Sequence, residues 1–338
     1  MTMGDLSSLL VWAAMTALTV AFVASTVALA RLAEASRRVP AARELATAGA
    51  PSGPAAVEAD AQPEVRPDGS PKAAGIARST SVTGAALLLA GIVTRGLAAG
   101  RWPTANMYEF ALVGAFIAVV VLVVVQRRRF IPFLSVVVLG IGVLALALAL
   151  TVLFVQADAV QPALQSYWLV LHVGVAIIAT GVFTVGFAAA VLQVLQDARE
   201  SGRSRVGAAA EAGKPGALHR WRVTGPAWAW LRSAPSAREL EAFSFRLNAI
   251  GFVLWTFTLI GGAIWAEHAW GRYWGWDPKE VGTFVAWVVY AAYLHARTTR
   301  GWSGRRAAYM VFVGYAVVLA NFTVVNLFVD GKHSYSGL

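Results

Sequence analysis

Long apolar segments separated by short polar ones run through most of this 338-residue chain. Eight of these segments are long enough to cross the roughly 30 Å hydrocarbon core of a bilayer as a helix. They cover residues 8–30, 82–100, 107–126, 131–155, 166–195, 247–266, 280–297 and 307–329. The pattern predicts an all-α fold, a polytopic membrane helix bundle with about eight transmembrane helices.

Basic residues collect between alternate spans. Segments 31–81, 127–130, 196–246 and 298–306, together with Arg297, hold 23 of the 28 lysines and arginines. Because basic loops stay on the cytoplasmic side, these segments are predicted to be cytoplasmic. An even number of spans then places both termini outside, with segments 101–106, 156–165, 267–279 and 330–338. Topology and anionic lipid explain the net charge of +10, and no nucleic acid is expected as a partner.

The same pattern divides the chain into five parts. Residues 1–30 are predicted to be an N-terminal transmembrane anchor, since Met1–Leu10 lacks the positive charge that begins a signal peptide. Residues 31–81 and 196–246 are predicted to be cytoplasmic flexible linkers, the second with an interfacial patch at Trp221–Trp230. Residues 82–195 hold transmembrane helices 2–5. Residues 247–338 hold helices 6–8, an outward-facing segment 265–280 and a C-terminal tail.

The segment Trp265–Glu280, WAEHAWGRYWGWDPKE, combines aromatic rings with a short charged end. Its four tryptophans, Trp265, Trp270, Trp274 and Trp276, offer broad and rigid faces, which favours a platform for a large flat ligand. An interfacial tryptophan belt is the alternative.

Histidine is the soft ligand that the chain offers, because it has no cysteine and any thiol must come from a partner. His172 and His333 are both predicted at the outer surface, beside the tryptophans, and two neutral imidazoles with a flat apolar wall suit a bis-histidine haem site. His295 lies roughly 22 Å further in along its helix, which indicates a second site or a helix-end histidine. His219 and His268 are interpreted as solvated residues, although His268 is near enough to reach the outer site.

Two charged groups carry structural and functional interpretations side by side. In DPKE, Pro278 suits the first turn of a helix, so Asp277 and Glu280 either cap that helix or, for Asp277, orient a ligand. Lys279 is the candidate for meeting a haem propionate. Glu109, in NMYEF, is expensive at a span edge unless it pairs with Arg95 or Arg101, and we expect a structural clamp there.

These residues resemble a known family. The stretch 265–297, WAEHAWGRYWGWDPKEVGTFVAWVVYAAYLHAR, is similar to the WWD signature of the CcsA/ResC-type proteins of system II cytochrome c maturation. RWPTANMYEF at 101–110, PALQSYWLVLHVGVA at 162–176 and HSYSG at 333–337 agree with it. The resemblance begins near residue 80 and contributes little over 196–245.

The resemblance implies a function for each of these parts. It implies that His172 and His333 hold an outer haem b against the tryptophans and Asp277, and that His295 ligates an intramembrane haem. It also implies a holocytochrome c synthase (haem lyase) complex in the bacterial plasma membrane, with its active face extracytoplasmic. Its partners would be a ResB-like second membrane subunit, apocytochrome c with its CxxCH motif, and a thioredoxin-like thiol reductant.

Three other classes remain open at this point. A haem exporter would use the same sites without contacting an apocytochrome. A transporter of another small molecule would normally show internal repeats or broken midplane helices, which are not evident. A purely structural subunit would not need the outer histidines.

Overall fold

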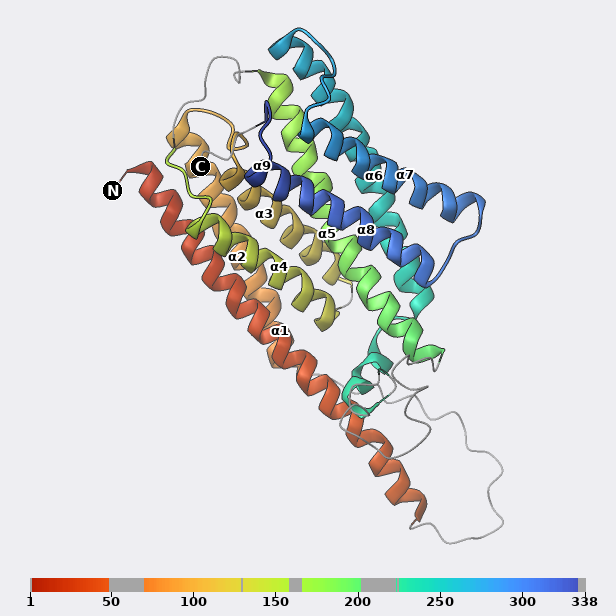
Figure 1. Cartoon of the computed structure of the whole chain (residues 1–338). Helices are drawn as coiled ribbons and strands as arrows, with labels where there is room; N and C mark the ends of the chain where they lie inside the picture. Colours follow the sequence, from red (N-terminus) through yellow and green to blue (C-terminus); the bar gives the residue numbers. More distant parts are fainter. Residues whose placement is uncertain are drawn as a thin grey trace.

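The computed structural model describes residues 2–48, 70–128, 130–157, 166–201, 223 and 225–333. Within these residues every regular element is a helix, and most of the helices lie side by side in one bundle (Figure 1). They are α1 (Met3–Ala48), α2 (Pro71–Ala99), α3 (Met107–Gln126), α4 (Pro132–Thr151), α5 (Tyr167–Glu200), the 3-10 helix η3 (Pro226–Ser233), α6 (Ala237–Trp270), α7 (Pro278–Thr299), α8 (Arg305–Phe322) and α9 (Val324–Phe328).

Seven helical segments of the described chain are long and apolar enough to cross a membrane. The prediction of an all-α membrane bundle is therefore confirmed, and the chain is a multi-pass membrane protein. The remaining predicted span, 280–297, corresponds to α7, which lies beside α8 although its sequence includes His295 and Arg297 (Figure 1). The side of the membrane that each terminus faces stays a prediction.

Helix occupies parts of both segments that were predicted as linkers. α1 continues to Ala48, and α2 begins at Pro71, where the Ser70 hydroxyl accepts a hydrogen bond from the Ala73 amide at 3.3 Å. The residues after position 30 are rich in alanine, arginine and glutamate, which all favour helix, while the charged arginines and glutamates lower the hydropathy of the segment. Residues 49–69 and 202–222, which make up the rest of the predicted linkers, lie outside the described residues.

The tryptophan patch predicted at Trp221–Trp230 differs from the structure. Trp230 is only 6% exposed and stacks on Phe133, with ring centroids 5.4 Å apart. It belongs to a small core with Leu32 and Leu192, where η3 meets α1 and α5. Packing inside the protein therefore accounts for Trp230, while Trp221 lies outside the described residues.

Two larger apolar cores fill the bundle, one among α1–α4 and the other among α5–α8. α5 joins them, since it packs along α6 and also contacts α3 and α8. Glycines permit this close packing: a Cβ at Gly181 would lie 2.6 Å from Ile117, and one at Gly251 would overlap the Phe183 ring. The start of α5 and the end of α6 are thus held in fixed positions, and the candidate site lies there.

We expect Gly84→Val to destabilise the contact between α1 and α2. A Cβ at Gly84 would lie 2.6 Å from the Leu18 side chain, whereas one at Gly75 of the same helix would meet nothing within 4 Å. Overpacking costs about 1–3 kcal/mol, so the melting temperature of the detergent-purified protein should fall by several degrees. Gly75→Val is the matched control, and equal melting temperatures for the two variants would contradict this packing.

Candidate functional site

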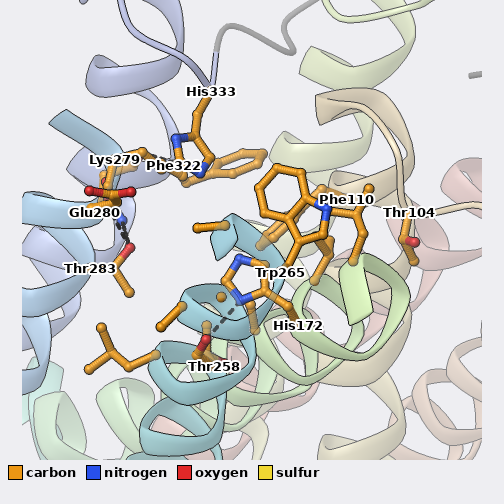
Figure 2. A pocket seen from close by; sticks show the side chains of 18 of the residues that line it. Thr104, Phe110, His172, Thr258, Trp265, Lys279, Glu280, Thr283, Phe322 and His333 are labelled. Carbon is orange, nitrogen blue, oxygen red and sulfur yellow. Dashed lines mark hydrogen bonds between the residues drawn. The ribbon is translucent and has the colours of Figure 1, made fainter. Parts of the chain in front are cut away.

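An open pocket lies where the start of α5, the end of α6 and the start of α7 meet (Figure 2). It contains about 1120 Å³ of space, a figure that includes the part open to solvent. Most of its wall is apolar or aromatic. Several polar side chains also line it, and those of Lys279, Glu280, Thr283, Asn321 and Asn326 lie on the side formed by α7, α8 and α9.

His172 lies in the second turn of α5 and faces α6. Its Nδ1 is 2.7 Å from the Thr258 carbonyl oxygen, which can only accept, so Nδ1 carries the proton and Nε2 keeps the lone pair. Gly262 makes room for the ring, since a Cβ there would lie 2.7 Å from His172 Cε1, whereas a Cβ at Gly261 would make only an ordinary contact with His172 at 3.7 Å. The packing of α5 on α6 therefore fixes both the place and the tautomer of this imidazole (Figure 2).

His333 lies in the tail after α9, and Asp277 holds it. Its Nδ1 is 2.7 Å from Asp277 Oδ2 and donates a hydrogen bond to it. In this second imidazole, as in the first, the lone pair is therefore on Nε2. Burial lowers the pKa of His333, and the bond to Asp277 only partly opposes this shift, so the imidazole is neutral at pH 7. His333 lies at the rim of the pocket, across the opening from His172 (Figure 2).

Asp277 acts both as a helix cap and as the acceptor for the tail. It is the N-cap of α7, and its Oδ2 accepts from the Lys279 amide at 3.2 Å while its Oδ1 accepts from the Lys332 amide at 2.6 Å. Glu280 completes a capping box by accepting from the Asp277 amide at 3.1 Å. Burial raises the pKa of Asp277, but hydrogen bonds from Lys332 and His333 outweigh it and hold the pKa below its usual value. Both interpretations of Asp277 therefore describe contacts that are present.

The four tryptophans of the segment have different surroundings. Trp265 is 1% exposed and lies beside both imidazoles, with ring centroids 6.4 Å from His172 and 5.9 Å from His333. Trp270 contacts both Trp265 and His333, at 4.9 and 5.1 Å. Trp274 lines the pocket, whereas Trp276 is 74% exposed and does not. The platform predicted as one surface is thus divided between a buried part and an outer part.

The other histidines lie away from the pocket. His295 is exposed near the far end of α7, about fifteen residues from the pocket wall, or roughly 22 Å along the helix. His268 belongs to the last turn of α6 and has a side chain that is 56% exposed, as expected for a solvated residue. His219 and the tail residues 334–338 lie outside the described residues.

A buried ionic cluster supports the loop before α3. Glu109 is fully buried, and its carboxylate lies 3.0 Å from Arg95 Nε and 2.7 Å from Arg101 Nη1. The same carboxylate accepts from the Ala105 amide at 2.9 Å, and the Asn106 side chain caps α3. The predicted pairing of Glu109 is confirmed, with both arginines as partners. Because residues 104–106 line the pocket, this clamp fixes one edge of the site.

Comparison with known proteins gives the family. A family model described as cytochrome C assembly protein matches residues 104–333, about two thirds of the chain and the same interval that builds the pocket. The chain belongs to the cytochrome c assembly family. The cytochrome c biogenesis protein CcsA of Synechococcus sp. (strain CC9902) is 34% identical over 268 residues, which are 77% of this chain and 86% of the relative. CcsA of Parasynechococcus marenigrum (strain WH8102) is 35% identical over 254 residues, 74% and 82% of the two chains.

The chain is therefore a CcsA-type membrane component of cytochrome c biogenesis. A solved structure, cytochrome c heme lyase CcmF, has a similar fold with a TM-score of 0.61 and 15% identity. That match covers 100% of this chain and 49% of CcmF, so the CcsA-type chain spans about half the length of CcmF.

Some residues of the site carried little or no signal in the sequence. Thr258 contributes only its backbone carbonyl, which every residue possesses, so its role has no signature. Gly261 and Gly262 form a pair of small residues inside a predicted span, a signal for close helix packing that does not say which side chain they face. Asn321, near the end of α8, and Asn326, in the separate short helix α9, also line the pocket, and the continuous apolar pattern conceals the break between these two helices.

We expect Glu109→Gln to destabilise the CcsA-type chain strongly. The substitution removes the carboxylate charge that both Arg95 and Arg101 contact, and removal of one partner of a buried ion pair costs about 3–5 kcal/mol. The melting temperature of the purified protein measures the effect. Glu267→Gln, at an acid whose side chain is 41% exposed, is the control and should change the melting temperature little. Equal shifts for the two variants would contradict the clamp.

Proposed function

We propose that the pocket binds haem b between His172 and His333 and presents it for covalent attachment to apocytochrome c. The observation that supports this most directly is the pair of imidazoles on the pocket wall, each with Nδ1 bonded to an acceptor and Nε2 left as the basic nitrogen. Neutral imidazoles with this tautomer are suited to be axial ligands of haem iron.

The donor set favours haem over a simple metal ion. Within the described residues no group of three or more His, Asp or Glu side chains could hold a metal ion. Haem iron already has four ligands from its porphyrin, so it requires only the two that this pocket offers. The buried ring of Trp265 and the surrounding apolar wall suit a flat, largely apolar ligand.

The reaction that we propose adds the two thiols of a CxxCH motif to the two haem vinyl groups. Each thiol forms a carbon–sulfur bond, and its hydrogen goes to the neighbouring vinyl carbon, so the addition involves no net oxidation. This chain has no cysteine, so both thiols come from the apocytochrome, kept reduced by a thioredoxin-like protein. The contribution of the chain is orientation, which can lower a barrier by about 7–11 kcal/mol at best.

A second membrane subunit, similar to ResB, completes this proposal. His295 is exposed on α7 on the same face as Val288, which lies two turns earlier and is 43% exposed, so that face offers an imidazole beyond an exposed apolar side chain. We assign His295 to an inner haem site whose other ligand comes from the partner subunit. Haem taken up there from the cytoplasmic side would move outward to the pocket of the same complex, in the bacterial plasma membrane.

The names of the similar proteins support a role in attachment. The curated relatives are cytochrome c biogenesis proteins, and CcmF is a cytochrome c heme lyase. The alternative, a haem exporter without synthase activity, would use the same ligands and differ in its product. A transporter of another small molecule would not need two oriented imidazoles.

We expect His172→Ala and His333→Ala each to weaken the low-spin haem spectrum of the complex purified with its partner. Loss of an axial imidazole should lower the yield of holocytochrome c at least about tenfold, and added imidazole should restore the spectrum. Absorption spectra of reduced and oxidised protein, with cytochrome c counted by haem staining, measure both effects.

His268→Ala is the matched control for these variants, because this exposed histidine lies at the same end of the bundle. Spectra and yields that are unchanged in both site variants would refute the ligand assignment. Haem that still reaches the outer side without any attachment to a supplied apocytochrome would favour the exporter.

We expect His295→Ala to reduce the amount of haem held by the complex. The low-spin spectrum of the haem at the outer site should persist. Thr299→Ala is the control, since Thr299 is exposed one turn further along the same helix. Haem content per complex, measured as the pyridine haemochrome, should fall for His295→Ala alone. Equal haem content in the two variants would remove the inner site from the proposal.

A further inference from the structure

The pocket has one polar wall, and a lysine lies at its centre. Lys279 Nζ donates to the Asn321 carbonyl oxygen at 2.8 Å and to Asn326 Oδ1 at 3.0 Å. Figure 2 shows Lys279 and Thr283 on one side of the pocket, with Phe110 and Thr104 on the opposite side. The ammonium group of Lys279 therefore lies on one side of a pocket whose opposite side includes the apolar ring of Phe110.

No acid of the described chain serves as the counter-ion of Lys279. Its two hydrogen-bond acceptors are neutral, and an ammonium group has a third donor. The nearby carboxylates are engaged elsewhere: Asp277 accepts from Lys332 and His333, and Glu280 accepts from the amides of Gly275 and Asp277. Burial lowers the pKa of Lys279 to about 7, against the opposing charge of Asp277.

A buried ammonium without an anion is unfavourable, and a bound anion removes that cost. The rest of the wall, which includes Phe110, Phe322 and Leu259, suits an apolar ligand. The ligand that matches both walls is flat and largely apolar and carries a carboxylate on one edge. Inorganic anions match the lysine but not the remainder of the pocket.

We propose that Lys279 forms a carboxylate subsite that anchors the propionate edge of the haem and so determines the orientation of the ring in the pocket. This inference rests on the proposed function of the same site. Since the vinyl groups lie away from the propionates, the vinyl edge then faces Phe110 and the loop 101–106. That loop is held by Glu109 and exposes Trp102, which is 71% exposed, so the apocytochrome thiols approach from this side.

The test compares haem with its dimethyl ester, which has the same iron, ring and vinyl groups but no carboxylate. Each is titrated into the complex of the full chain with its membrane partner, and binding is followed by the low-spin spectrum. A hydrogen bond between two charged groups predicts that the unaltered complex binds the free acid about tenfold or more tightly than the ester. Lys279→Gln should abolish this preference while the low-spin spectrum remains, and Lys279→Arg should retain it.

Lys332→Gln is the matched control, because the exposed Lys332 lies over Trp270, 5.4 Å from the ring centroid, beside His333. It should leave the preference for the free acid unchanged. Equal affinities of the unaltered complex for haem and for its dimethyl ester would refute the carboxylate subsite. This result would not depend on any variant. A preference that survives in Lys279→Gln would overturn it as well, and both outcomes leave haem binding intact. Absence of a low-spin spectrum with either compound would instead refute the proposed function.

Discussion

The carboxylate of Asp277 holds together parts of the site that are far apart in the chain. It caps α7, accepts from the amide of Lys332 and accepts from the ring of His333, so the start of a helix and the tail share one acceptor. Hydrogen bonds with a charged acceptor are among the stronger ones in proteins. The position of His333, its tautomer and the direction in which α7 begins all depend on this group.

The two imidazoles are fixed with different stiffness. His172 belongs to a long helix packed on α6, where Gly262 lets the ring lie close to the α6 backbone and Nδ1 is bonded to the Thr258 carbonyl oxygen. His333 belongs to a short tail held mainly by contacts to Asp277 and the rings of Trp265 and Trp270. Segments with few buried contacts open at the lowest free energy. Local opening of the site is therefore less costly on the side of the tail.

The sequence predicted which segments form the helical bundle better than it predicted which way their side chains face. Apolar runs identified the bundle, and charge at span edges identified the pairing of Glu109, because both follow from the cost of polar groups in a membrane. The pattern did not distinguish Trp265, which is buried beside both imidazoles, from Trp276, which is exposed, since the direction in which a side chain faces depends on how neighbouring helices pack. The helical ends of the linkers were missed because residues that favour helix there are not apolar.

The low hydropathy of α7 follows from its role in the site. Its first turns supply Lys279 and Thr283 to the pocket wall, and it is joined to α6 by hydrogen bonds from the indoles of Trp255 and Trp287, each 3.0 Å long. Such polar contacts reduce the apolar signal by which a span is recognised, while they fix the register of the helix against its neighbour. α7 supplies polar residues to the pocket wall. For that reason its sequence is a weaker signal of a membrane span than the sequences of its apolar neighbours.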